Sequence, residues 1–285
     1  MRPPDFEYSG PGTLREALEY LDSRPGSKVL AGGQSLIPLL KTRLASPAAL
    51  VDINGISELS YITTGRGVLR FGALARHRDF ELGELPRQLE IFRDVSKQLG
   101  DTQVRNMGTA CGSMAHADPA GDWGPAAVAV GARLIVESVD GRREVMARNF
   151  FKGPFSTDLR ENEILVGVEV PFSEGQGTAY TKLKRKTDDF ATVGAAVSVR
   201  VSRGGSIESA TLVLAGAGEV PVAVEINDVV KGRTPDEAAD EIKKVAGQAG
   251  EYQEDLRGSV EYKREMAGVM ALRSLRSAYS RARGD

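Results

Sequence analysis

The 285-residue chain contains a single cysteine, Cys111, and only two histidines. One thiol excludes an internal disulfide, and it excludes a [2Fe–2S] cluster held by this chain alone, because such a cluster needs about four ligating side chains. With so few histidines and no matched nucleophile, we expect neither a metal site nor a catalytic triad. If the protein handles electrons, any iron–sulfur cluster therefore lies on another chain.

The sequence also lacks an excess of charge of one sign and lacks long apolar runs. Lysine and arginine number 37 and aspartate and glutamate 39, a net charge of −2, so we expect no nucleic acid partner. No stretch approaches the roughly 18 apolar residues of a membrane-spanning helix, and the first residues have no apolar core of a signal peptide. We therefore expect a cytoplasmic protein whose contact with a membrane is at most peripheral.

Glycine, by contrast, is abundant. The chain has 32 glycines, more than the usual share of roughly 7%, so an unusual part of the backbone must turn sharply or approach something closely. Apolar residues make up 41% and charged residues 27%, which is typical of a folded globular protein. At roughly 100 to 200 residues per domain, the length predicts two domains or one large one.

Local signals at the start of the chain predict a helix, a strand and a second helix. Thr13 and Glu16 have the spacing of a capping box, so we expect a helix that runs to about Arg24. A short strand at 28–30 then enters a first glycine loop at 31–35, and its last residue, Ser35, is expected to cap the next helix.

A second glycine-rich segment spans residues 105–122 and enters an Ala/Val-rich helix at 123–130. The runs 133–137 and 144–147, joined by Asp140-Gly141, predict a hairpin. After residues 173–177 the composition changes. Three β-rich runs follow, at 179–184, 193–201 and 207–214, and polar helices come after them, the last from Tyr262 to Arg281. This order predicts an α+β protein with one domain at 1–173 and a smaller sheet-and-helix domain at 178–285.

The two glycine loops suit a ligand that contains a pyrophosphate, because glycine lets backbone N–H groups close on phosphate oxygens. Neither loop has the spacing G-x-G-x-x-G or G-x-x-x-x-G-K-[ST], which excludes the Rossmann and P-loop patterns. Taken singly, Gly32-Gly33 and the pair Gly108 and Gly112 are more typical of plain turns.

Taken together, these segments carry a more specific pattern. The first is AGGQSLIPLLKTRL at 31–44, followed by VDI at 51–53, and the second is RNMGT at 105–109, continuing to Asp122. Two more are KLKRK at 182–186 with DFAT at 189–192, and EYK at 261–263 with MAGVM at 266–270. In this order they resemble the flavin-carrying medium subunits of the molybdenum hydroxylases, the carbon monoxide dehydrogenase and xanthine dehydrogenase family.

The resemblance implies a fold and a cofactor. Residues 1–173 would form an FAD-binding domain of the vanillyl-alcohol-oxidase (PCMH) type, with two α/β subdomains that hold an extended FAD between them. Residues 178–285 would form a domain like the carbon monoxide dehydrogenase flavoprotein C-terminal domain. The expected cofactor-binding residues are Ala31, Gly32, Gly33, Gln34, Ser35, Leu36, Thr109, Gly112, Ser113, Asp122, Leu165 and Lys182.

The resemblance also implies a role for each position. Residues 31–35 and 109–113 would wrap the pyrophosphate from opposite sides through backbone N–H groups. Asp122 would accept hydrogen bonds from ribose or adenine donors, Leu165 would lie against the flavin, and Lys182 would reach its polar edge and stabilise a reduced, anionic ring. We expect no catalytic residue on this chain.

Several of these residues have plainer explanations. Lys182 alternates with Lys184 and Lys186, which without the resemblance is typical of a solvated strand face. Cys111 stands where the family usually has glycine, so we expect a small apolar filler there in preference to a redox thiol. We expect His116 to shape its loop rather than to catalyse. We expect Trp123, at the start of the next helix, to pack in the core rather than to stack on a ligand.

The resemblance implies a function in electron transfer. Electrons would pass from a molybdenum cofactor on a large subunit, through [2Fe–2S] clusters on a small subunit, to FAD on this chain and then to an external acceptor, in a dimer of heterotrimers. The alternatives are a free-standing FAD oxidase of the same fold and an assembly scaffold without cofactor. The substrate, whether carbon monoxide, an aldehyde or an N-heterocycle, and the acceptor, whether quinone, oxygen or NAD, stay open at this point.

Overall fold

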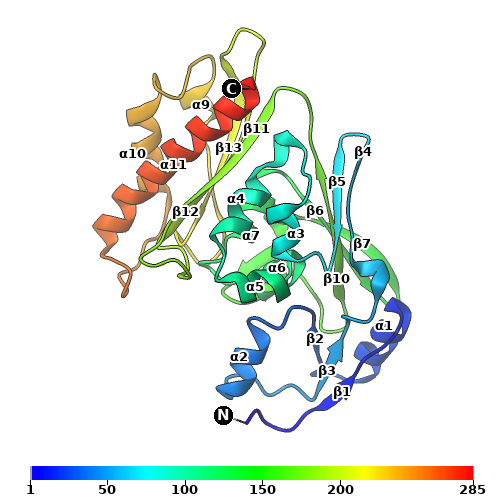
Figure 1. The fold of residues 1–285 in the computed structure, drawn as a ribbon. Coiled ribbons are helices and arrows are strands. Elements are labelled where there is room, and N and C mark those ends of the chain that lie inside the picture. The colour runs from blue at the N-terminus through cyan, green and yellow to red at the C-terminus, as the bar shows by residue number, and fades with distance from the viewer. Residues whose placement is uncertain (1, 285) are drawn as a thin grey trace.

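The computed structural model describes residues 2–284, which form four β-sheets with helices between and over them (Figure 1). The predicted α+β class is therefore confirmed. Within the described range, no helix is both long enough and apolar enough to cross a membrane.

The first sheet is small and parallel, and it contains the start of the chain. Its order is β1 (Glu7–Ser9), β3 (Ala49–Asp52) and β2 (Lys28–Leu30), and it is accompanied by α1 (Leu14–Ser23) and α2 (Leu36–Lys41). The capping box expected at Thr13 and Glu16 is present at the start of α1. Ser35 precedes α2 as expected, but its side chain makes no capping hydrogen bond.

The second sheet is antiparallel. The larger of two hydrophobic cores packs against it. The sheet has the order β4 (Ile62–Gly65), β5 (Val68–Gly72), β10 (Ile164–Pro171), β6 (Arg133–Ser138) and β7 (Gly141–Met146). The hairpin expected around Asp140-Gly141 joins β6 to β7. Short elements complete this region: η1 (Ser57–Leu59), α8 (Ala147–Phe150), β8 (Phe151–Gly153) and β9 (Ser156–Thr157).

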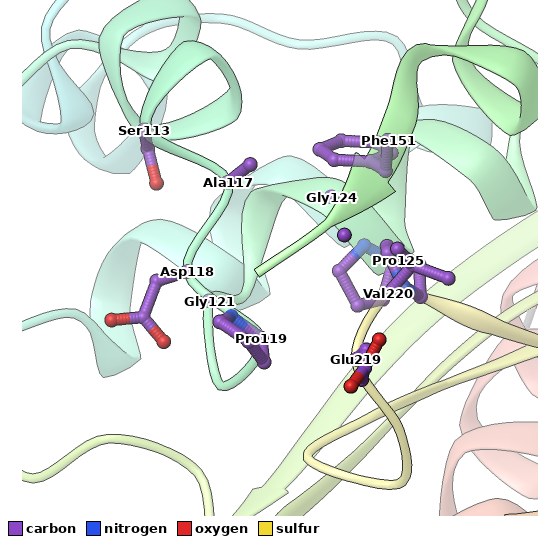
Figure 2. Close-up of a pocket in the computed structure, with 12 residues that line it drawn as sticks. Ser113, Ala117, Asp118, Pro119, Gly121, Gly124, Pro125, Phe151, Glu219 and Val220 are labelled. Atoms are coloured by element: carbon purple, nitrogen blue, oxygen red, sulfur yellow. The ribbon is translucent and has the colours of Figure 1, made fainter. Parts of the chain in front are cut away.

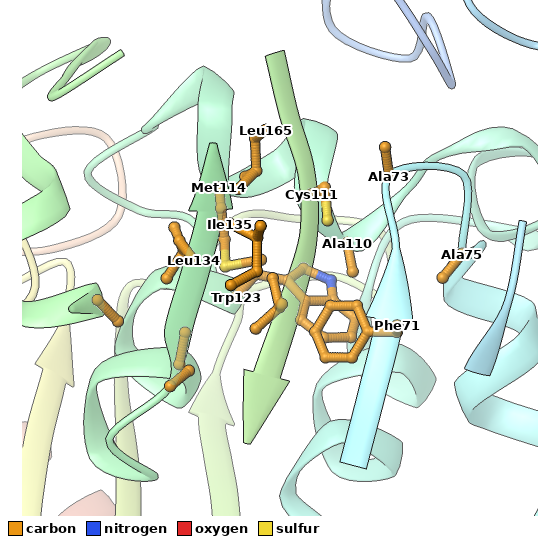
Figure 3. Close-up of a cluster of buried hydrophobic side chains, with 14 of the residues drawn as sticks. Phe71, Ala73, Ala75, Ala110, Cys111, Met114, Trp123, Leu134, Ile135 and Leu165 are labelled. Carbon is orange, nitrogen blue, oxygen red and sulfur yellow. The ribbon is translucent and has the colours of Figure 1, made fainter. Parts of the chain in front are cut away.

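A cluster of helices between β5 and β6 covers this sheet. It consists of α3 (His77–Leu82), η2 (Arg87–Leu89), α4 (Ile91–Gln98), α5 (Thr102–Met107), α6 (Ala110–His116) and α7 (Trp123–Ala129). Trp123 lies at the centre of the core and packs against Phe71 and Phe92, as the labelled Trp123 and Phe71 of Figure 3 illustrate. Its ring is fully buried, so the expected packing role is confirmed. The second glycine loop, a name used from here on for residues 107–113, comprises the short turn between α5 and α6 and the first turn of α6.

The C-terminal sheet has the order β11 (Gln176–Leu183), β12 (Val193–Val201), β13 (Ile207–Ala215) and β14 (Val222–Val224). Three helices follow: α9 (Asn227–Val230), α10 (Ala239–Ala249) and α11 (Val260–Arg283). The three predicted β-rich runs became the first three strands, whereas β14 and α9 were not predicted.

Both faces of the C-terminal sheet are buried, on different cores. Along β12, Ala195 packs in the core that α10 and α11 cover, whereas the next residue, Ala196, packs in the larger core with α4 and α7. Successive residues of a strand point to opposite faces, so this alternation places one sheet between two helical layers. A bidentate ion pair adds to the contact, since Arg281 donates to Asp94 through Nη1 at 2.6 Å and Nη2 at 2.8 Å.

Candidate functional site

The two glycine loops, far apart in the sequence, touch each other. A Cβ added to Gly32 would lie 2.5 Å from the carbonyl oxygen of Met107 and 2.6 Å from the Cα of Gly108. Figure 1 shows the same approach, with the chain between β2 and α2 beside α5 and α6. A side chain at Gly32 would therefore push the loops apart, which explains why this position needs glycine.

The first loop offers unpaired backbone donors. Gly33 has φ +71°, and a Cβ there would lie 2.8 Å from Cδ1 of Ile37. Within the described part of the chain, the N–H groups of residues 32–35 have no hydrogen-bond acceptor, and the Ser35 hydroxyl is equally without a partner. Consecutive N–H groups in such a turn form a concave site that suits an anion.

The second loop offers fewer donors than expected, and at different positions. Thr109 caps α6, because its Oγ1 accepts from Gly112 N at 3.1 Å and its carbonyl oxygen accepts from Ser113 N at 3.0 Å. Among residues 2–284, the N–H groups of Thr109 and Cys111 are without an acceptor. The donors of this loop that are available to a phosphate are thus Thr109 and Cys111, whereas those of Gly112 and Ser113 are already used.

Cys111 lies in the first turn of α6, and its side chain points into the core. Sγ lies 3.6 Å from the carbonyl oxygen of Gly72, and Figure 3 shows the thiol among Met114 and Leu165. The thiol is buried and free, and burial raises its pKa. These properties are those of a small apolar filler, and the side chain leaves the amide on the loop side unobstructed.

We therefore expect Cys111 to be unreactive in the native protein. A disulfide reagent that reports on free thiols should label it at the rate of global unfolding, because only the thiolate reacts and both burial and its raised pKa suppress the thiolate. In denaturant the same reagent should label one thiol per chain. Labelling of the native protein at the rate of an exposed cysteine would contradict this placement.

A third segment, residues 75–77, holds the second loop in place through two backbone hydrogen bonds. Ala110 N donates to the carbonyl oxygen of Ala75 at 3.1 Å, and His77 N donates to that of Gly108 at 3.0 Å. The segment contains no glycine and no motif, so the sequence did not single it out as part of the site. Its position after β5 was the one available signal.

His77 has a structural role in this arrangement. Its ring stacks on Trp123 at 5.6 Å, and Nδ1 accepts a hydrogen bond from the indole Nε1 at 3.0 Å. Burial, with the nearby charges of Arg76 and Arg105, lowers the pKa of His77 to about 3. The ring is therefore neutral at ordinary pH and carries its proton on Nε2, next to Gly108.

The other histidine lies at the end of α6. The His116 ring packs against Phe155 at 5.1 Å, and burial lowers its pKa. The nearby Asp118 accepts from Ala120 N at 2.8 Å, a local turn contact. No nucleophile contacts either residue in the described chain, so the geometry favours the expected role in shaping the loop.

Asp122 and Lys182 are brought together by the fold. Lys182 Nζ lies 2.8 Å from Asp122 Oδ2, and each side chain is only 1% exposed. The second carboxylate oxygen accepts from the Tyr180 hydroxyl at 2.5 Å. Burial raises the pKa of the Asp122 carboxyl, against the opposing effect of the Lys182 ammonium group and the two hydrogen bonds. A carboxylate from the start of α7 is thus held by two side chains of β11.

This buried group of three, which we call the Asp122 cluster, has two consequences. Lys182 is not on a solvated strand face, although the alternating lysines are typical of one. Tyr180 was missed by sequence reasoning, yet it lies two residues before Lys182 on β11 and so shares its face. The cluster connects the larger core to the C-terminal sheet, close to where α6 and α7 meet.

The other expected residue on a strand is Leu165. It lies on β10, beside a bulge between Leu165 and Gly167, and it is buried in the larger core. Figure 3 places it above Cys111 and Met114. Leu165 and the second glycine loop therefore belong to one contiguous part of the molecule.

Of two hollows, the smaller borders the second glycine loop. Figure 2 shows it, with a volume of about 10 Å³, lined by Ser113 and Asp118 on one side and by Phe151 and Glu219 on the other. The larger, an open groove of about 1010 Å³, follows β4 and α3 on a different side and contains none of the expected residues. Ser113 thus lies where the second glycine loop approaches the turn before β14.

Two family models match the chain. Residues 4–173 match the FAD binding domain in molybdopterin dehydrogenase. Residues 178–278 match the carbon monoxide dehydrogenase flavoprotein C-terminal domain.

Curated relatives match over nearly the whole length. The carbon monoxide dehydrogenase medium chain of Hydrogenophaga pseudoflava is 38% identical over 99% of both chains. The glyceraldehyde dehydrogenase medium chain of Sulfolobus acidocaldarius is 36% identical over 97% of this chain and 99% of the relative. Among solved structures, reconstituted carbon monoxide dehydrogenase from Oligotropha carboxidovorans is similar with a TM-score of 0.93 and 34% identity, over 99% of this chain and 100% of that one. The chain therefore belongs to the FAD-binding medium subunits of the molybdenum hydroxylases, a family of oxidoreductases.

Proposed function

We propose that this protein carries FAD as the electron-transfer subunit of a molybdenum hydroxylase. Electrons would come from a molybdenum cofactor on a large subunit, through [2Fe–2S] clusters on a small subunit, and leave to an external acceptor. The observation that carries the proposal is the contact between Gly32 and the Met107–Gly108 peptide, with unpaired N–H groups on both loops. Neutral, donor-rich loops of this kind fit a diphosphate.

The division of labour follows from what this chain contains. In residues 2–284, no group of three or more His, Cys, Asp or Glu side chains is placed to hold a metal ion. Bound FAD supplies a centre that accepts and releases electrons, and the protein supplies its binding, orientation and electrostatics. We assign those tasks to the loops and to the Asp122 cluster.

We propose the following cofactor-binding residues: Ala31, Gly32, Gly33, Gln34, Ser35, Leu36, Thr109, Gly112, Ser113, Asp122, Leu165 and Lys182. Residues 32–35 would donate backbone N–H groups to one side of the diphosphate. From the second loop, the geometry supports donation by Thr109 and Cys111, with Gly112 allowing close approach. Lys182, held at 2.8 Å from Asp122, would supply positive charge towards the flavin end.

The names of the relatives indicate where substrate selection lies. Medium chains of a glyceraldehyde dehydrogenase, a carbon monoxide dehydrogenase and a nicotine 6-hydroxylase all match this chain over at least 97% of its length. Their substrates have little chemistry in common, whereas their medium chains are similar to one another in being similar to this chain over nearly its whole length. We propose that the substrate is recognised by the large subunit and that this chain, divided at 1–173 and 178–285, provides the common flavin module.

The test is cofactor retention by the purified full chain. We expect a yellow protein that releases FAD on denaturation, and we expect Gly33→Val to retain much less, because valine at φ +71° would be strained and its Cβ would meet Ile37. Asp122→Ala should also retain less, because it leaves the buried Lys182 ammonium unpaired. His116→Ala is the control, since its ring packs only at the loop's end.

Flavin absorbance, normalised to folded protein by circular dichroism, measures the outcome. Equal retention in the three variants would refute the residue assignment. A colourless wild type, even after incubation with FAD, would favour the scaffold alternative. Turnover of an organic donor by the isolated chain would favour the free-standing oxidase.

A further inference from the structure

Two side chains outside both glycine loops join the loops by a continuous chain of hydrogen bonds. Asn54 Nδ2 donates to the carbonyl oxygen of Ala31 in the first loop at 2.8 Å. Arg76 Nη2 donates to Asn54 Oδ1 at 2.6 Å, and its Nη1 donates to the carbonyl oxygen of Met107 beside the second loop. We call this connection the Asn54–Arg76 bridge.

Both ends of the bridge are fixed by further contacts. Asp52 Oδ1 accepts from the backbone N of Asn54 at 2.9 Å and from its Nδ2 at 2.6 Å, while Tyr8 donates to Oδ2 at 2.8 Å. At the other end, the backbone N of Arg76 donates to Asp79 Oδ2 at 2.8 Å. The Asn54 amide has acceptors on its nitrogen and a cation on its oxygen, so its orientation is determined by the network.

The bridge also orients the first loop. In a trans peptide the carbonyl oxygen and the following N–H point in opposite directions. Because Asn54 draws the carbonyl oxygen of Ala31 towards the bridge, the N–H of Gly32 faces away from it. The unpaired N–H of Gly32, the first of the unpaired donors of residues 32–35, therefore lies on the side of the loop away from the bridge.

Arg76 is suited to this place by its charge. Its guanidinium forms no salt bridge within 4.0 Å in residues 2–284, and it is half-buried and hydrogen-bonded to the backbone beside the second loop. Burial lowers the pKa of Arg76, and the nearby carboxylates of Asp79 and Asp52 oppose that effect. The loops themselves contain no charged side chain, whereas a diphosphate carries two negative charges. A cation held behind neutral N–H donors increases the attraction for such a group.

We propose that Asn54 and Arg76 are positioning residues for the cofactor, and that their bridge holds the two glycine loops at the separation that a diphosphate needs. Neither residue belongs to the loops or to the Asp122 cluster. The inference rests on the proposed function, because it assumes that the loops bind FAD.

The test is a double-mutant cycle on FAD binding by the full chain. The variants are Asn54→Ala, Arg76→Met and the two together, with FAD affinity measured from quenching of flavin fluorescence. Each single change is expected to weaken binding by about tenfold to a hundredfold, the range for loss of a hydrogen bond to a charged group. The double variant should be little worse than either single variant, because each change breaks the same bridge.

Two further variants separate positioning from general stability. Arg76→Lys keeps the charge and can make one of the two contacts, so it should recover part of the affinity; it also serves if the methionine variant does not fold. Arg78→Met removes an exposed arginine two residues away and should bind FAD like the wild type. The thermal unfolding midpoint of the FAD-free protein should be similar in all of these variants.

The outcomes distinguish a failure of the proposed function from a failure of the Asn54–Arg76 bridge. If the wild type binds no FAD, the proposed function fails. If the wild type binds FAD and Arg76→Met binds it equally well, the bridge alone is refuted. Effects of Asn54→Ala and Arg76→Met that simply multiply, or a loss confined to Arg76→Met, would also overturn the bridge, because the charge would then act without Asn54.

Discussion

Replacing Lys182 by methionine is expected to lower the free energy of unfolding by about 3–5 kcal/mol near pH 8, the cost of leaving one partner of a buried ion pair alone. Asp122 would keep only the Tyr180 hydroxyl as a partner in a site that is 1% exposed. Methionine matches much of the lysine volume, so the loss would come mainly from the unpaired charge. Chemical denaturation monitored by circular dichroism measures it.

The deficit should depend on pH in a defined direction. Without the ammonium group, burial still raises the pKa of the Asp122 carboxyl above the ordinary value of about 3.9 that it has in the unfolded chain, and only the Tyr180 hydrogen bond and the Lys184 charge oppose that effect. Between those two pKa values the folded state binds the extra proton, so the stability of the variant falls as pH rises. Lowering the pH from about 8 to about 5 should therefore recover part of the loss.

A second variant provides the control. Asp122→Asn combined with Lys182→Met removes both charges, and the pH-dependent part of the deficit should disappear while the asparagine can still accept from Tyr180. If Lys182→Met alone unfolds like the wild type at every pH, the ammonium group contributes nothing to the fold. The Asp122 cluster would then not connect the two cores as described.

Acid is expected to destabilise the wild type through His77. Its folded pKa, lowered by burial to about 3, lies well below the ordinary value of about 6.5 in the unfolded chain. Below pH 6.5 the unfolded state binds a proton that the folded state does not, so stability falls as the pH decreases towards 3. At 1.36 kcal/mol per pH unit, the full effect is about 4–5 kcal/mol.

His77→Gln tests this assignment. Glutamine offers an oxygen that can accept from the Trp123 indole in place of Nδ1, and it does not titrate. The variant should have a flatter dependence of the unfolding free energy on pH between about 6.5 and 4. His116→Ala should keep most of the wild-type slope, since that ring is less buried. An unchanged slope in His77→Gln would assign the acid sensitivity to other groups.

Elements whose signals are local could be predicted from the sequence. The capping box at Thr13 marked the start of α1, and the hairpin between β6 and β7 followed from Asp140-Gly141. The last helix was expected from Tyr262 to Arg281 and runs from Val260 to Arg283. Capping and turn chemistry involve residues three or four apart, so their geometry is the same in any fold.

The candidate site was predictable only in part. The glycines of both loops were visible, because a backbone that must turn or approach another backbone closely is restricted to glycine. The pairing of Asp122 with Lys182 across 60 residues was not visible, because their spacing gives no period that would join them. The same limit applied to Asn54 and Arg76, which are polar residues of an ordinary kind until the fold sets them between two loops.

The sequence by itself determined the local backbone, the strand and helix faces, the family, and the fact that one cysteine cannot hold an iron–sulfur cluster. Only the tertiary structure decided which N–H groups stay unpaired, which cation lies behind them, and that Lys182 is buried against Asp122 instead of solvated. The reason is physical: propensity and periodicity act over a few residues, whereas burial and long-range hydrogen bonds exist only after distant segments have been packed together.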